Sequence, residues 1–249
     1  MSPATRRLVL RYGIAIDLVI LRESTEGLFA SRGRGTVEND REARDVMVIT
    51  RATCEGLFDF AFKLAERRKA RGGKGRVTCV DKANVFASMA FFRKVFDERA
   101  RQFPAIAADH QYVDATALDL VRKPWEFDVL VMENMFGDIL SDLGAGLVGG
   151  MGMAPCAEFG ERHGLFPPAH GSAPDIAGTD RANPTAMLLS AGLMLDWLGE
   201  RHGVGACVAA ADRLERAIEA GFRAKAIRPI EQGGAQTTSE VAEAVIGML

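Results

Sequence analysis

The largely apolar run Phe127–Met132, followed at once by a polar turn and an amphipathic segment, constrains the fold more than any other feature. Its length suits a buried strand rather than a helix. Asn134 is a residue type that caps helices, and it precedes a predicted helix over Met135–Leu143. A buried strand that leads directly into a helix is typical of the α/β class.

The same alternation of strands and helices runs along the rest of the chain, so we expect an α/β protein. Strands or extended segments are predicted over Ile14–Leu21, Val77–Val80 and His110–Asp114. Further helices are predicted from a cap at Asn39 or Asp40 to about Arg71, and over Phe86–Arg101, Ala115–Val121, Thr185–Arg201, Ala211–Ile227 and Ser239–Met248. The Gly/Arg-rich stretch Ser31–Gly35 indicates a hairpin or arm.

A change of composition divides the chain. Gly144–Gly152 contains five glycines in nine residues, and we place a domain crossing there. The two predicted domains are 1–146 and 147–249. The second carries the Gly/Pro-rich loop Phe166–Pro184.

Composition excludes several classes of function. Hydrophobic residues make up 48% of the chain, charged residues 26%, and the net charge is −2, which gives no sign of nucleic-acid or anionic-membrane binding. No apolar stretch reaches the roughly 18–20 residues of a membrane span, and Met1–Arg7 is not followed by the hydrophobic core of a signal peptide. The four cysteines form no CxxC pair, which argues against a zinc or redox motif and fits a reducing, cytoplasmic environment.

Two carboxylates form the first candidate site. Asp138 and Asp142 are four residues apart on a predicted helix, so they share a face and repel each other by ~0.2–0.5 kcal/mol. A bound cation would reverse that repulsion, and hard oxygen ligands suit Mg²⁺ or Mn²⁺. An isolated DxxxD is more often a pair of solvated aspartates, but this one follows a buried strand, where α/β sites usually lie.

Two other polar residues lie at the end of a predicted strand or extended segment, or just after one. Asp114 adds a third carboxylate, and Lys82 stands in Val80-Asp81-Lys82-Ala83-Asn84. A lysine close to a cation and partly buried has a lowered pKa and can transfer protons. On spacing alone, a plain surface lysine is the commoner explanation.

At these residues the sequence resembles the isopropylmalate/isocitrate dehydrogenase family of metal-dependent β-decarboxylating dehydrogenases. Four motifs carry the resemblance, in the family's order: Val80-Asp81-Lys82-Ala83-Asn84-Val85, His110-Gln111-Tyr112-Val113-Asp114, Asn134–Leu143 and His170–Gly178. The resemblance implies an isopropylmalate dehydrogenase-like fold of two α/β domains. It begins near Ile14, and family members usually start about a hundred residues earlier, so we expect an N-terminally truncated cofactor domain.

The resemblance also implies roles for the first domain, as a substrate, metal and dimerisation domain. Asp138 and Asp142 would bind Mg²⁺ or Mn²⁺ from one subunit of a homodimer. Asp114, as a ligand, and Lys82, as a catalytic group, would come from the other subunit. Arg22 would grip a substrate carboxylate, as a guanidinium does well, and Asn84 would lie beside the substrate and nicotinamide.

The second domain would hold part of the cofactor site. In the family, the loop that begins His170-Gly171-Ser172-Ala173 binds the adenosine half of the cofactor. Asp175 matches an aspartate that NAD-linked members place against the ribose hydroxyls, where it would repel the 2′-phosphate of NADP. Asn183 would contact the adenine. The cofactor is therefore expected to be NAD.

The chain departs from the family pattern at Phe29, where full members usually carry a tyrosine that protonates the enolate, and a phenyl ring has no proton to give. Three hypotheses follow. The chain is an NAD-dependent enzyme that decarboxylates a small malate-type substrate of the 3-isopropylmalate or isocitrate class, or it oxidises tartrate or malate without obligatory decarboxylation. Alternatively, it is a truncated, non-catalytic subunit of a family oligomer.

Overall fold

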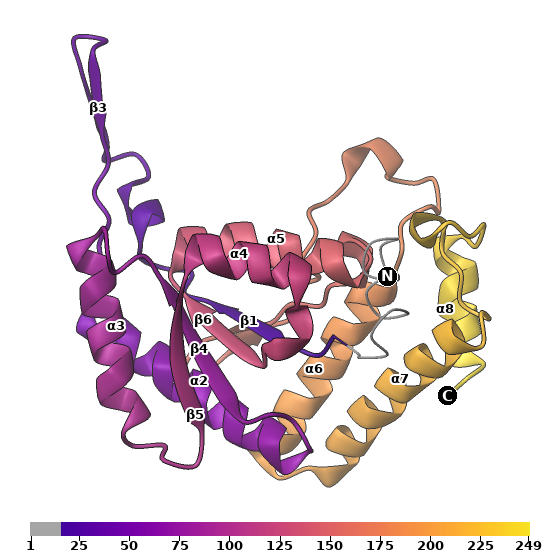
Figure 1. The fold of residues 1–249 in the computed structure, drawn as a ribbon. Coiled ribbons are helices and arrows are strands. Elements are labelled where there is room, and N and C mark those ends of the chain that lie inside the picture. The colour runs from indigo at the N-terminus through magenta and orange to yellow at the C-terminus, as the bar shows by residue number, and fades with distance from the viewer. Residues whose placement is uncertain (1–15) are drawn as a thin grey trace. The chain divides into compact units, whose positions relative to one another are not determined.

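The computed structural model describes residues 16–249, which form two compact units that divide between Gly144 and Ala145 (Figure 1). The expected boundary lay two residues later, after residue 146. The functional roles expected for the two domains stay predictions. Met1–Arg7, and Ile14 at the start of the first expected strand, lie outside the described residues.

The first unit is built on a four-stranded parallel sheet. In spatial order its strands are β1 (Val19–Arg22), β6 (Val129–Met132), β4 (Arg76–Asp81) and β5 (Ala107–Tyr112). The central strand β6 is buried throughout, as expected for a strand covered on both faces. Because all four strands are parallel, their carboxyl ends meet at one edge, where α/β proteins usually bind ligands. The predicted α/β class is confirmed, and its sheet is parallel.

Helices cover both faces of this sheet. Helices α2 (Arg51–Ala70) and α3 (Ala87–Ala100) pack together through Phe58, whose ring lies 4.7 Å from that of Phe92, centroid to centroid, in an edge-to-face contact. Helix α4 (Val113–Arg122) packs on β4 and β5 from the other side (Figure 1). The remaining helix, α5 (Asn134–Val148), follows β6.

The expected helix start at Asn39 or Asp40 is wrong, because these residues form the tip of a hairpin. Strands β2 (Thr36–Glu38) and β3 (Glu42–Arg44) are antiparallel and exposed, and they extend well away from the sheet (Figure 1). Asn39 and Asp40 have φ angles of 51° and 55°, a left-handed conformation that these two residue types tolerate in tight turns. The two residues therefore form a hairpin turn and do not cap a helix.

Other expected boundaries also shift. Strand β1 is described from Val19 rather than Ile14. Strand β5 starts earlier than His110 and ends at Tyr112, so Asp114 lies in the first turn of α4 and not in an extended segment. Helix α5 continues through the first glycines of the glycine-rich stretch Gly144–Gly152. It ends at Val148, before two glycines whose φ angles of 121° and 129° no other residue adopts readily.

The second unit is mainly helical in the described residues. It contains α6 (Thr185–His202), α7 (Gly205–Arg223) and α8 (Thr238–Ile246), with a buried cluster of Ile218, Ile227, Val241 and Val245. Helix α7 begins six residues before the expected Ala211, and α8 begins with a capping box at Thr237. Two short strands, β7 (Glu158–Phe159) and β8 (Gly164–Leu165), were not predicted.

Two further features concern membrane-spanning helices and cysteines. No helix within 16–249 is long and apolar enough to cross a bilayer. All four cysteines are free thiols in the structure.

Candidate functional site

The carboxyl end of β1 delivers Arg22 to the start of α5. Its Nε donates to Asn134 Oδ1 at 2.9 Å, and its Nη1 lies 2.5 Å from Asp138 Oδ1. The Asn134 amide in turn donates to the Glu26 carbonyl at 3.1 Å. Asn134 is thus a bridge between β1 and α5, and it fixes the plane of the Arg22 guanidinium.

A glycine allows this close approach. A methyl group added at Gly137 would lie 2.5 Å from Arg22 Cγ and 3.1 Å from Arg22 Cα. The first turn of α5 therefore packs directly on the backbone and stem of Arg22. Any larger residue at this position would separate Arg22 from Asp138, since the obstructing atoms include backbone.

The cap of α5 is Glu133, and the expectation that Asn134 caps this helix is wrong. The Glu133 carboxylate accepts the N–H groups of Met135, at 3.0 Å, and Phe136, at 2.8 Å. Glu133 is 1% exposed, and this burial raises the pKa of its carboxyl above the ordinary value. A side chain just before the helix can satisfy its first N–H groups as well as a short N-cap residue does.

Lys82 and Asp114 are brought together from neighbouring strand ends. Lys82 follows β4, and its Nζ lies 2.5 Å from Oδ1 of Asp114, which follows β5. The ion pair with Lys82, together with backbone N–H groups at the start of α4, lowers the pKa of Asp114. Lys82 Nζ also lies 5.7 Å from the ring centre of Tyr112.

A buried carboxylate beneath this pair was missed by sequence reasoning. Asp81 is fully buried, and it accepts two hydrogen bonds from Arg93, at 2.7 and 2.8 Å, and one from the N–H of Ala83. The Arg93 guanidinium also lies over Tyr112, 5.2 Å from the ring centre. This network fixes the turn that presents Lys82 and leaves Asn84 exposed beside it. The spacing of Asp81 and Arg93 gives no sequence signal, because many arginines lie on exposed helix faces.

Asp138 and Asp142 fit the chemistry of a divalent cation site. Both are exposed and lie one helical turn apart on α5, at the ligand-binding edge of the sheet. Carboxylate oxygens are the ligands that Mg²⁺ and Mn²⁺ prefer. Within residues 16–249 of one chain, no three acidic, histidine or cysteine side chains gather into a metal-binding cluster. Asp114 is instead paired with Lys82, and the expected sharing of ligands between two subunits stays a prediction.

The expected cofactor loop lies in the second unit and is exposed from Gly171 to Asp175. His170 Nδ1 contacts the Gly171 carbonyl oxygen at 2.8 Å. Ala173 adopts a left-handed conformation with φ 44°, directly before the short 3-10 turn Pro174–Ile176 that carries Asp175. Ser172 is exposed in the same loop, so the Asp175 carboxylate and the loop backbone are accessible to a ligand.

The side chain of Asn183 is hydrogen-bonded within the second unit, and the expected contact of this residue with adenine stays a prediction. Its Oδ1 accepts from the N–H and hydroxyl of Thr185, at 3.1 and 2.7 Å. Its Nδ2 donates to Glu231 Oε2 at 3.0 Å and to the Met153 sulfur at 3.4 Å. These contacts use the full hydrogen-bonding capacity of the amide. Contact with an adenine would therefore have to come from other groups of this residue. Glu231, which sequence reasoning missed, also accepts the Gly152 N–H.

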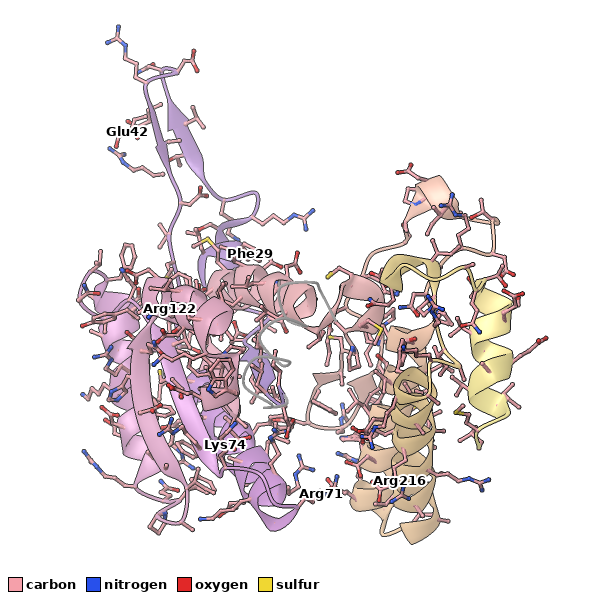
Figure 2. All side chains as sticks on the ribbon, turned by 45° about the vertical axis from the view of Figure 1, so that its right-hand side comes forward. Phe29, Glu42, Arg71, Lys74, Arg122 and Arg216 are labelled. Carbon is pink, nitrogen blue, oxygen red and sulfur yellow. The ribbon has the colours of Figure 1, made fainter. Side chains whose placement is uncertain are left out.

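Phe29 lies at the base of the hairpin that carries Glu42, on the side of the unit away from Lys74 (Figure 2). Its ring centre is 5.5 Å from the Arg22 guanidinium carbon, and the ring is 43% exposed. The position is thus part of the same site as Arg22. A phenyl ring can hold the cation there but cannot donate a proton.

Comparisons with known proteins cover nearly the whole chain. A family model described as isocitrate/isopropylmalate dehydrogenase matches residues 4–245, so that the match begins ten residues before the expected Ile14. A 3-isopropylmalate/3-methylmalate dehydrogenase of Methanocaldococcus jannaschii is 47% identical over 92% of this chain and 66% of its own length. A 3-isopropylmalate dehydrogenase of Carboxydothermus hydrogenoformans is 40% identical over 93% of this chain and 62% of its own length.

The solved structures agree. The crystal structure of isocitrate dehydrogenase from Methylococcus capsulatus superposes with a TM-score of 0.82 at 39% identity, and the match covers 93% of this chain and 66% of that one. The isopropylmalate dehydrogenase-like fold is therefore confirmed. The chain spans about two thirds of the length of the relatives that it matches.

Proposed function

The chain belongs to the isocitrate/isopropylmalate dehydrogenase family, and from this we propose that it serves the NAD-dependent oxidative decarboxylation of a malate-type 2-hydroxy acid. The substrate would be of the 3-isopropylmalate or isocitrate class. One observation supports the proposal: the carboxyl edge of the sheet in each chain carries both the Arg22–Asp138 pair and the Lys82–Asp114 pair. In a homodimer, the first pair of one subunit and the second pair of the other would together supply an anion-binding group, cation-binding carboxylates and a proton-transfer group.

Asp138 and Asp142 would hold Mg²⁺ or Mn²⁺, with Asp114 of a second subunit as a further ligand. When bound, the cation would supply Lewis-acid stabilisation of negative charge on the substrate oxygen. Arg22 is already committed to Asp138, at 2.5 Å. A ligand that takes over the Asp138 carboxylate would free the guanidinium, and Arg22 could then bind a substrate carboxylate through two parallel hydrogen bonds.

Lys82 would move the substrate proton. Its side chain is about three-quarters buried, and Nζ lies close to Asp114 and the Tyr112 ring. Bound NAD would supply the acceptor for a hydride from the carbon that carries the hydroxyl, and the hydroxyl proton must pass to a base. The resulting β-keto acid loses CO₂ and must gain one proton at carbon. In its neutral form, Lys82 would accept the first proton at Nζ and return it to carbon later, and Asn84 is exposed two residues further along.

The preference for NAD rests on Asp175. Its carboxylate is exposed in the loop after His170, where a ribose hydroxyl can be accepted and a 2′-phosphate would be repelled. His170, Gly171, Ser172 and Ala173 would contribute backbone and side-chain contacts to the adenosine half. Asn183 would support this loop indirectly through its buried hydrogen bonds.

A homodimer would complete the site. Large apolar residues are exposed on the two helices that carry the carboxylates: Leu118 is 54% exposed and Val121 48% on α4, and Ile139 is 59% exposed beside Asp138 on α5. Exposed apolar residues of this size commonly mark interaction surfaces. A second copy that covered these helices would also bring its own Lys82 and Asp114 to the site. We further propose a cytoplasmic location, since the four cysteines are free thiols.

Phe29 favours a second candidate function. Because the ring beside Arg22 carries no hydroxyl, protonation of the enolate lacks the donor that a tyrosine would provide. An oxidation that ends at the keto acid, as with tartrate or malate, needs no such proton. A non-catalytic role in a family oligomer is the third candidate, because the same ring leaves the site without that proton donor.

The test is to mix the purified chain with Mg²⁺, NAD and, separately, 3-isopropylmalate, isocitrate, tartrate or malate. Absorbance of the reduced cofactor should rise with one substrate and stay flat in Lys82→Met, and CO₂ release separates decarboxylation from simple oxidation. A Phe29→Tyr variant should raise CO₂ release without raising the rate of cofactor reduction. No signal with any substrate would favour the non-catalytic role, and a preference for NADP would refute the role of Asp175.

A further inference from the structure

Asp81 is a buried carboxylate that the proposed reaction does not use. It is the last residue of β4, and its side chain is fully buried. Arg93 on α3 donates two parallel hydrogen bonds to it, from Nε to Oδ2 at 2.7 Å and from Nη2 to Oδ1 at 2.8 Å. A planar guanidinium makes such a paired contact and a lysine cannot reproduce it. The pair therefore fixes the direction of both side chains.

The Asp81 carboxylate also holds the turn that contains Lys82. Its Oδ1 accepts the N–H of Ala83, the residue after Lys82, at 2.8 Å. The Lys82 carbonyl accepts the N–H of Phe86 at 3.1 Å, and α3 begins directly after Phe86. The chain from Asp81 into α3 is thus a loop, and the contact between Arg93 and Asp81 closes it.

The ring of Tyr112 links Arg93 to the Lys82 side chain. Tyr112 is paired with Asp81 in the parallel register of β5 and β4, so these two side chains lie on the same face of the sheet. The Arg93 guanidinium carbon lies 5.2 Å from the centre of the ring, and Lys82 Nζ lies 5.7 Å from it. Both distances are within the range of cation–π attraction, so one ring holds both cations.

The position of the Lys82 amine therefore depends on more than its ion pair. Asp114 Oδ1 accepts from Nζ at 2.5 Å. In the proposed reaction Asp114 would be a ligand of the cation, and its hold on Lys82 would weaken. The turn held by Asp81 and the ring of Tyr112 would then have to keep the amine in place, and both are in contact with Arg93.

We propose that Arg93 is a positioning residue for Lys82, and that it acts through Asp81 and the Tyr112 ring. In a variant without the guanidinium, Asp81 would be a buried carboxylate that has lost its cation, and such a group moves toward water or takes up a proton. Either change weakens its hydrogen bond to Ala83 and shifts the turn. The effect on the position of Lys82 follows from these contacts alone, whereas the effect on catalysis rests on the proposed function.

Nuclear magnetic resonance measures the position of Lys82 without any need for activity. The full chain is labelled isotopically in its lysines, and Lys82→Met identifies the signal of the methylene protons next to Nζ. In wild type we expect this signal upfield of the other lysines, because the protons lie over the Tyr112 ring. Arg93→Met should move it to the position of an ordinary lysine. Arg93→Lys, which keeps a cation beside Asp81 and so protects the fold, should move it in the same direction.

Arg99→Met is the matched control. Arg99 lies near the end of α3, away from the turn, and it donates two parallel hydrogen bonds to Asp59, both at 2.7 Å. Its side chain is 22% exposed, close to the 27% of Arg93. Arg99→Met should leave the Lys82 signal upfield, and Tyr112→Phe should also do so, because the ring remains. The proposal is wrong if the signal stays upfield in both Arg93 variants, or if Arg99→Met moves it equally far.

Kinetics test the consequence for the proposed reaction. With a substrate that supports cofactor reduction, Arg93→Met should lower kcat by about 10- to 100-fold and leave KM nearly unchanged, since a displaced proton-transfer group lowers the rate and not the binding. An unchanged kcat in a variant that has lost the upfield signal would overturn the role of Arg93. If wild type reduced no cofactor, that result would count against the proposed function alone, and the resonance comparison would still decide whether Arg93 positions Lys82.

Discussion

Substitution of Gly137 by alanine should lower the free energy of unfolding, because it disturbs the contact between Arg22 and α5. The added methyl would lie 2.5 Å from Arg22 Cγ and 3.1 Å from Arg22 Cα, well inside contact distance. Because Cα belongs to the backbone, a rotation of the Arg22 side chain cannot relieve the clash, and β1 and α5 must move apart. Overpacking of this kind costs about 1–3 kcal/mol.

Alanine also favours the helix, and that gain opposes the clash. In a helix interior, alanine is better than glycine by about 0.8–1 kcal/mol. The substitution Gly146→Ala isolates this gain in helix propensity, since Gly146 lies on the same helix and nothing is within 4 Å of the added methyl. Gly146→Ala should therefore stabilise by up to about 1 kcal/mol, whereas Gly137→Ala should destabilise by about 1 kcal/mol.

Urea unfolding followed by circular dichroism measures both variants. The two midpoints should move in opposite directions, with a difference of about 2 kcal/mol between the variants. If Gly137→Ala proved as stable as Gly146→Ala, the close packing of α5 on Arg22 would be wrong.

Two predictions concern ionisable groups. Burial raises the pKa of Glu133 above 4.5, so the folded state holds this proton more tightly than the unfolded chain, and stability should fall as pH rises from 4.5 through the raised value. Unfolding midpoints between pH 4.5 and 7 should show this fall in wild type but not in Glu133→Gln, and parallel profiles would contradict it. Lys82 lowers the pKa of Asp114 below 3.8, so Lys82→Met should raise the carboxyl titration midpoint of Asp114 in NMR. An unchanged midpoint would show that the ion pair does not persist in solution.

Much of the fold could be predicted because its strands and helices have strong periodic signals. The buried strand β6 and the helices α2, α3 and α6 were located within a few residues, apart from the start of α2. That start was missed because asparagine and aspartate favour helix caps and left-handed turns alike. The φ angles of Asn39 and Asp40 show that the hairpin turn prevails here.

The sequence indicates individual residues of the candidate site, but not the contacts between them. The family resemblance singled out Lys82, Asp114 and Asp138 as candidates, but their partners depend on which strands are neighbours, and a linear sequence does not show this. Arg93 reaches Asp81 from the next helix, and Glu133 caps α5 because the strand end is buried. Such contacts arise from tertiary packing, and no local pattern records them.

The proposed metal site can be tested most directly by thermal unfolding with Mn²⁺. Wild type should show a melting temperature that rises with Mn²⁺ concentration, because a ligand at 100 times its Kd stabilises the folded state by about 2.7 kcal/mol. Asp138→Asn/Asp142→Asn should show no such rise, while Asp212→Asn, which changes a carboxylate on α7, should respond as wild type does. Equal shifts in wild type and in the double variant would contradict a cation site at Asp138 and Asp142.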